Sequence, residues 1–163
     1  MSRRRTVVGI VLLLAVAVVG GAVALVLANR GPGPDEVAEE FLTAQWTGDW
    51  TTECELATED WQHVLFEGHP FADCDAFADS AAKANADNPF LDYADDTDVD
   101  VSVQVRSDED DVARVEYVVE FRYHGEDRTG FDALWQGGSA ADRGTLQLAR
   151  VDGDWRVAAA DDV

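Results

Sequence analysis

The residues best suited to chemistry are two cysteines and two histidines that lie close together in the chain. Cys54, His63, His69 and Cys74 have the spacing C-x8-H-x5-H-x4-C. Thiolates and imidazoles are the usual ligands of zinc, but common zinc modules contain a close pair of cysteines, which is missing here. A redox pair would need a Cys-x-x-Cys motif, which is also missing. We therefore expect no metal and no cofactor at these residues.

The two cysteines, the only ones among 163 residues, instead suit a disulfide. Their even number fits this, and the membrane anchor predicted below would place them in an oxidising compartment. Joining residue 54 to residue 74 closes a loop of about 20 residues, which the chain-entropy model values at roughly 3 kcal/mol. We predict a disulfide between Cys54 and Cys74 and ordinary surface or loop positions for the two histidines.

A second candidate for metal binding is the acidic stretch DDTDVDV. Asp96, Asp98 and Asp100 match the first three ligand positions of a calcium-binding EF-hand loop. The required glycine is replaced by Val101, and the glutamate at the twelfth position is replaced by Ser107. We therefore predict a solvated acidic edge leading into a strand, and no metal site.

Charge limits the partners of the chain. Residues 31 to 163 contain all 33 acidic residues and eight of the 12 basic ones, a net charge of 8 − 33 = −25. Such a field repels nucleic acid, so we expect no nucleic-acid partner. The acidic surface would suit a basic protein partner or high salt.

An apolar segment precedes the acidic region. Residues 7–28 carry no charge, and as a helix they would be about 33 Å long, enough to cross a bilayer. Three arginines before the segment place the N-terminus in the cytoplasm. A cleaved signal is the alternative, because AVA at 22–24 resembles a cleavage site, but signal cores usually have about 7 to 15 residues. We predict a single-pass cell-membrane protein with a tail (1–6), an anchor (7–28), a linker (29–34) and an exported domain (35–163).

Periodicity predicts the elements of this domain. Helical spacing indicates a helix from 35 to Gly48, two short helices over 49–57 and 58–66, and an alanine-rich helix over 73–86. Strict alternation then predicts strands over 98–106 and 113–124, a long loop over 125–143, and strands near 144–151 and 155–160. Helices followed by an antiparallel meander predict an α+β fold, with the helices covering the apolar face of the sheet.

With these elements in order, TGDWTTECELATEDW and the final VDGDWRV resemble segments of the nuclear transport factor 2-like (NTF2-like) superfamily, in particular its small membrane-anchored bacterial members. The resemblance covers nearly all of residues 35–160. It implies a curved antiparallel sheet wrapped around a helix, forming a cone with an open cavity. The superfamily includes isomerases, dehydratases and many proteins that are not enzymes, so the resemblance implies a fold more firmly than an activity.

The catalytic members of the superfamily, as the resemblance implies, use a carboxylate base on the concave face of the sheet. Here Glu116 and Glu120 fall on the opposite face, between Arg114 and Arg122. A base could still come from Asp132 in the long loop or from a helix. We expect no catalytic residues and no enzymatic activity, and keep an acid/base enzyme of isomerase or dehydratase type as the least favoured alternative.

Large aromatic residues could instead line a cavity or contact a partner, and the simpler alternative is that they fill the mouth of the cone as core. These are Tyr117, Phe121, Tyr123, Phe131, Trp135 and Trp155. We predict an extracytoplasmic binding or scaffolding domain that assists an envelope assembly through a protein partner, with a binder of a small apolar ligand as the alternative. Family members often dimerise, and the charged outer sheet face could form a homodimer here.

Overall fold

The computed structural model describes residues 31–65 and 71–162, apart from the side chains of residues 63–65 and 162. Apart from one short helix between the second and third strands, the helices come first and the strands follow, so the predicted α+β order is confirmed. In chain order the elements are α2 (Pro34–Thr47), α3 (Trp50–Glu55), α4 (Glu59–Leu65), α5 (Cys74–Ala84), the 3-10 helix η1 (Pro89–Asp96), β1 (Thr97–Glu109), β2 (Val112–Tyr123), α6 (Arg128–Leu134), β3 (Ala141–Val151) and β4 (Asp154–Asp162).

The predicted transmembrane helix, and with it the predicted single-pass location in the cell membrane, must be corrected. None of the helices in the described ranges combines the length and the apolar composition needed to cross a membrane. Residues 7–28, on which that prediction depended, lie outside the described residues. We therefore no longer predict the anchor or the membrane location.

The sheet has four antiparallel strands in the order β1-β2-β3-β4, which confirms the predicted meander. Alternation in β2 buries Val115, Tyr117, Val119 and Phe121 and leaves the residues between them more exposed. This is the apolar face that the sequence predicts. A turn at Asp152 and Gly153, both with positive φ, joins β3 to β4 and suits a tight hairpin.

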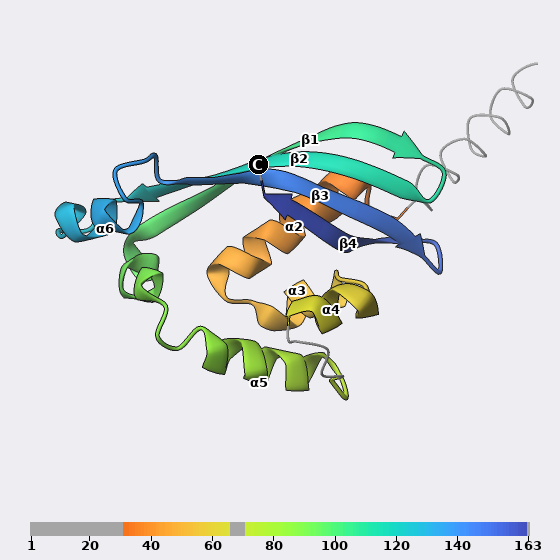
Figure 1. Cartoon of the computed structure of the whole chain (residues 1–163), viewed down its shortest axis with the longest axis horizontal. Helices are drawn as coiled ribbons and strands as arrows, with labels where there is room; N and C mark the ends of the chain where they lie inside the picture. The colour runs from red at the N-terminus through yellow and green to blue at the C-terminus, as the bar shows by residue number, and fades with distance from the viewer. Residues whose placement is uncertain (1–30, 66–70, 163) are drawn as a thin grey trace, which may run out of the picture. The chain divides into compact units, whose positions relative to one another are not determined.

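Helix α2 packs on the buried face of the sheet and contacts all four strands (Figure 1). Pro34 occupies its first turn, and the Glu36 side chain accepts a hydrogen bond from the Gly33 backbone N–H at 3.0 Å. Its apolar stripe, which includes Val37 and Phe41, is almost completely buried. Gly48 ends the helix in the left-handed conformation, at φ 76°, where a glycine avoids strain.

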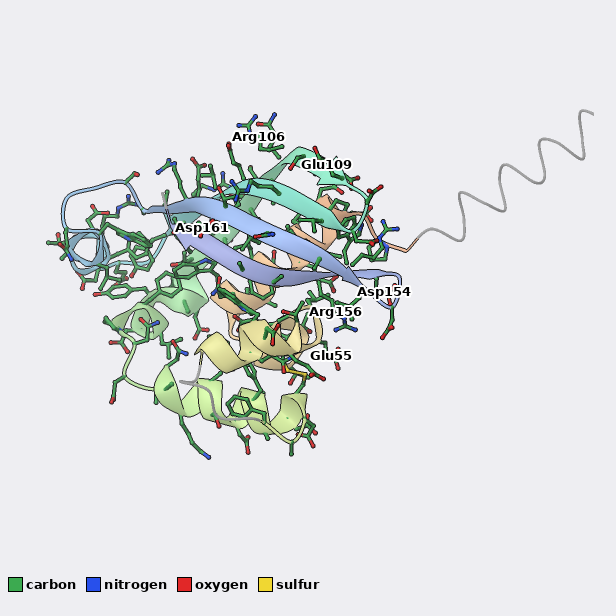
Figure 2. All side chains as sticks on the ribbon, turned by 45° about the vertical axis from the view of Figure 1, so that its right-hand side comes forward. Glu55, Arg106, Glu109, Asp154, Arg156 and Asp161 are labelled. Carbon is green, nitrogen blue, oxygen red and sulfur yellow. A yellow bond between two sulfur atoms is a disulfide. The ribbon has the colours of Figure 1, made fainter. Side chains whose placement is uncertain are left out.

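The segment between α3 and α4 covers one edge of the sheet. Ala57 forms a parallel bridge with Val157 of β4, and the Thr58 N–H donates to the Val157 carbonyl at 2.8 Å. The Arg156 guanidinium donates to the carbonyl of Glu55, and Figure 2 shows these two residues side by side. The small helices are thereby fixed to the last strand of the chain.

Two short helices lie where no helix is predicted. The stretch NPFLDY, which ends the predicted alanine-rich helix, contains the start of η1, and the Asn88 side chain before it accepts a hydrogen bond from the Phe90 N–H at 3.0 Å. Helix α6 lies within the predicted loop 125–143 and begins after Asp127, whose side chain accepts a hydrogen bond from the Gly130 N–H. Strand β3 begins at Ala141, three residues before the predicted strand.

Candidate functional site

The most unusual polar residue of the described chain is Glu53, a buried carboxyl group on α3. Only 3% of its surface is exposed, and it is the only charged or polar residue in the buried class among the described residues. Helix α3 begins after Asp49, whose carboxylate accepts a hydrogen bond from the Thr52 N–H at 3.2 Å. Trp50, Glu53 and Cys54 follow the helical spacing i, i+3, i+4 and therefore lie on one face of α3. That face turns inward.

Glu53 lines a partly open cavity of about 310 Å³ between α2, α3, α5 and η1, which we call the helical cavity. Its volume is at the small end of the range for small-molecule sites. Most of its wall is apolar or aromatic, and three amide side chains add hydrogen-bonding groups. The aromatic residues are Trp46, Trp50, Phe77 and Phe90, and the amides are Gln45, Asn85 and Asn88.

The electrostatics of the helical cavity are dominated by one unpaired group. The Glu53 carboxyl has no hydrogen bond or ion pair with any described residue, and burial raises its pKa from 4.5 to about 7. Trp46 also lines the cavity, and its indole N–H is buried and lacks an acceptor among the described residues. Polar groups that are buried without a partner are rare in folded proteins and call for an explanation.

A disulfide holds the two walls of the helical cavity together. Cys54 and Cys74 are bonded, with their Cα atoms 5.5 Å apart, which confirms the predicted pair. The bridge joins α3, directly after Glu53, to the first residue of α5. Cys54, Phe77 and Ala81 form a small buried cluster separate from the main core. Of the two histidines, His69 and the side chain of His63 lie outside the described part of the chain.

The six aromatic residues proposed for a cavity or a partner contact lie elsewhere. Tyr117, Phe121, Phe131 and Trp155 are buried in the main core, and Tyr123 and Trp135 are half-buried against it. The Phe121 and Trp135 rings stack with their centroids 4.9 Å apart, and those of Tyr123 and Phe131 at 4.8 Å. None of the six lines the helical cavity; Trp46, which does, contacts Phe121 edge-on at 4.6 Å.

The other carboxylates considered from the sequence are on the surface. Asp132, on α6, forms an exposed ion pair with Arg128 at 2.9 Å. Asp98 lies 3.5 Å from His124, and Asp100 pairs with Arg122 across the first two strands. These groups contact neighbouring side chains rather than a cavity.

The outer face of the sheet carries charges that pair within the chain. Glu116 binds Arg106, and this hydrogen bond lowers the pKa of the Glu116 carboxyl. Arg114 lies 3.9 Å from Asp161. Figure 2 shows Arg106 on the side of the sheet that faces away from the helices. The homodimer through this face stays a prediction.

Sequence reasoning missed Glu53 and the walls of the helical cavity. An acidic residue in a strongly acidic chain is assigned to the surface by default. The available signal was the spacing of Glu53 relative to Trp50 and Cys54, which puts the carboxyl on the same helix face as a tryptophan and a bonded cysteine. The amide and aromatic residues of α5 and η1 join the site only through tertiary packing.

Comparisons with known proteins yield only distant similarity. No family model and no curated protein matches the sequence. An NTF2-like transpeptidase of Campylobacter jejuni is similar in structure at 15% identity, with a TM-score of 0.49 over 78% of this chain and 99% of the other. A SEC-C motif-containing protein of Rhodopseudomonas palustris is similar at 16% identity, with a TM-score of 0.46 over 80% and 78% of the two chains. A de novo designed protein with a curved β-sheet has 17% identity and a TM-score of 0.36, over 74% and 88%. With every TM-score below 0.5, we base no conclusion about family or activity on these similarities.

Proposed function

We propose that the chain is a small-molecule-binding domain without catalytic activity, and that its binding site is the helical cavity. The observation that carries this proposal is the coincidence of an apolar cavity of about 310 Å³ with a buried, unpaired carboxyl group in its wall. Small-molecule sites typically combine apolar walls with a few polar groups that orient the ligand.

Binding is favoured over acid/base catalysis by the other residues of the wall. A Glu53 pKa of about 7 would suit a general base. A general base also needs a partner that stabilises the charge developing on the substrate. Among the described residues that line the helical cavity none is a tyrosine, histidine, lysine or arginine, so the neutral amides of Gln45, Asn85 and Asn88 are the main groups left for that role. The wall offers apolar contact and hydrogen bonds, which are the means of binding.

Filling the helical cavity should weaken binding. Ala84 is an exposed residue of α5 that lines the cavity, so Ala84→Trp places an indole at its opening without disturbing the core. The probe is N-phenyl-1-naphthylamine, an uncharged apolar dye whose fluorescence rises when it leaves water. We expect the full-length protein to bind it with one-to-one stoichiometry and Ala84→Trp to weaken the binding by about tenfold or more, which corresponds to about 1.4 kcal/mol.

The matched control is Ala82→Trp, which introduces the same side chain at an exposed position of α5 that does not line the helical cavity. This variant should bind the dye as the unmodified protein does. Equal affinities for the two tryptophan variants, or no dye binding by the unmodified protein, would refute the proposed site.

A further inference from the structure

The residue best placed to determine which ligand binds is again Glu53, because its buried carboxyl group has no positively charged partner among the described residues. Burying a carboxylate without a partner is costly, and proteins normally offset the cost with a cation or with several hydrogen bonds. Neither is present among the described residues that line the helical cavity. The residues that α2, α5 and η1 present to Glu53 are aromatic, aliphatic or amide side chains. Charged residues on or beside α3 and α5, such as Asp49, Glu55, Asp79 and Lys83, are exposed and do not line it.

The aromatic walls also favour positive charge. Trp46 and Trp50 line the same cavity as Glu53, and the face of an indole ring attracts an organic cation by its quadrupole. The whole domain adds to this effect, since a net charge of about −25 raises the local concentration of cations. An anionic ligand would be repelled both by the Glu53 carboxylate and by the net negative charge of the whole domain.

A metal ion fits these walls poorly. Hard cations need several oxygen ligands, and transition metals need clustered histidine, cysteine or carboxylate groups. The described part of the chain contains no group of three such residues that could hold a metal. A single carboxyl group beside aromatic and aliphatic surface suits a cation that carries its own hydrocarbon.

We propose that the helical cavity selects a small organic ammonium ion, whose charged nitrogen pairs with the Glu53 carboxylate and whose hydrocarbon part packs against Trp46 and Trp50. This inference rests on the proposed function and adds a ligand class to it. Glu53 is then the main determinant of specificity for the cation, and the apolar and aromatic walls supply affinity for the hydrocarbon part of the ligand. The two contributions can be separated by experiment.

The contribution of charge can be separated from that of apolar contact with three probes of similar shape and different charge. These are phenethylammonium, 2-phenylethanol and 3-phenylpropionate. Their binding to the full-length protein is measured by displacement of the dye at pH 8 and moderate salt. We expect phenethylammonium to bind about tenfold or more tightly than the alcohol, and the carboxylate to bind most weakly. In Glu53→Gln the preference for the ammonium ion over the alcohol should disappear, while the affinities for the alcohol and the dye stay within about twofold.

The matched control is Glu55→Gln, an exposed residue of the same helix. It removes the same charge from the domain but leaves the helical cavity unchanged, so the preference for the ammonium ion should persist. A preference that is undiminished in Glu53→Gln would show that the general acidic field or the indole rings, and not the Glu53 carboxylate, select the cation, and it would overturn the inference. Since that field is screened by salt, adding salt to such a variant should then abolish the part of the preference that the field causes.

Protonation provides an independent readout. The ammonium ion pairs only with the ionised carboxyl group, so its affinity should fall by about tenfold for each pH unit below about 7 and be constant just above it. Glu53→Gln should lose this dependence. Binding at pH 6 should also release protons, which calorimetry in buffers of different ionisation enthalpy detects.

The outcomes separate this inference from the proposed function. Dye binding together with equal affinities for the three probes overturns the ammonium selectivity and leaves the binding site in place. Failure of the dye to bind overturns both. Dye binding, ammonium preference and its loss in Glu53→Gln support both.

Discussion

Glu53 lowers the stability of the folded domain. Its side chain is almost completely buried, its carboxyl group has no partner among the described residues, and the pKa of about 7 reflects that burial. A glutamine would fill nearly the same space without a charge. Groups that reduce stability in this way are typical of functional positions. The cost to stability can be measured directly, because it depends on pH.

Glu53→Gln should therefore stabilise the protein above neutral pH. Below pH 4.5 the carboxyl is protonated in both the folded and the unfolded chain, and it has no effect on stability. Between 4.5 and about 7 the unfolded chain loses this proton while the folded chain keeps it, so the free energy of unfolding falls as pH rises. At about 1.4 kcal/mol for each pH unit, the penalty reaches about 3 kcal/mol at pH 8.

Urea denaturation of Glu53→Gln and of the unmodified protein at several pH values tests this. The difference in free energy of unfolding should grow from near zero at pH 4.5 to a plateau above 7. Taking the difference cancels the titration of the other carboxyl groups. Glu55→Gln, at an exposed position of the same helix, should show no such growth, and a flat difference for Glu53→Gln would contradict the assigned pKa.

At the scale of elements, the disulfide sets the position of α5. Helix α5 packs on α3 and lies farther from the sheet than α2, beyond α3 and α4 (Figure 1). The bond from Cys54 to Cys74 and the small cluster around Phe77 are therefore the principal described links between α5 and the remaining domain. The same contacts set the width of the helical cavity.

Replacing both cysteines by alanine should destabilise the protein by about 3 kcal/mol, because the unfolded chain regains the freedom of a loop of about 20 residues. Urea midpoints of the double variant and of the reduced unmodified protein should decrease together. Dye affinity should decrease as well, because α5 loses its fixed distance from α3. Thiol labelling should detect both cysteines only after reduction; labelling of the untreated protein, or an unchanged midpoint after reduction, would count against the bridge.

The parts of the fold that could be predicted are those with a strong local period. The alternation of β1 and β2 and the stripe of α2 depend on neighbouring residues, and both agree with the structure. Helix α6 was missed although Phe131, Leu134 and Trp135 have helical spacing, since two glycines and an acidic flank indicate a loop. Helix η1 begins with Asn88 and Pro89, which equally begin a turn. Helical spacing places Glu53 on the same face as Trp50 and Cys54, but its burial depends on packing against α5 and η1, which no local pattern predicts.

At the scale of the whole molecule, acidic charge exceeds what the ion pairs can neutralise. The ranges 31–65 and 71–162 contain exposed pairs such as Arg106 with Glu116 and Arg128 with Asp132. Each exposed pair contributes about 0 to 1 kcal/mol. Eight basic residues face 33 acidic ones beyond residue 30, so most carboxylates repel one another.

Salt should therefore stabilise the protein at pH 7. Raising ionic strength from 0.01 M to 1 M shortens the screening length from about 30 Å to about 3 Å, which weakens repulsion across the surface more than it weakens the few pairs. The melting temperature should rise by several degrees over this range. At pH 4, where many carboxyl groups are protonated, the same salt should have much less effect; a melting temperature that falls with salt at pH 7 would mean that the ion pairs outweigh the repulsion.

The two edges of the sheet differ in how open they are to pairing with a strand of another molecule. The chain around Ala57 binds the backbone N–H and carbonyl of Val157 in β4, whereas β1, with 13 residues, pairs on one side only among the described strands. Open edges invite strands of other molecules to join, and acidic side chains and irregular register discourage them. β1 has both, with Asp98 and Asp100 along its length and a register shift between Val105 and Ser107. The acidity that costs this domain stability thereby protects it from polymerising through its own sheet.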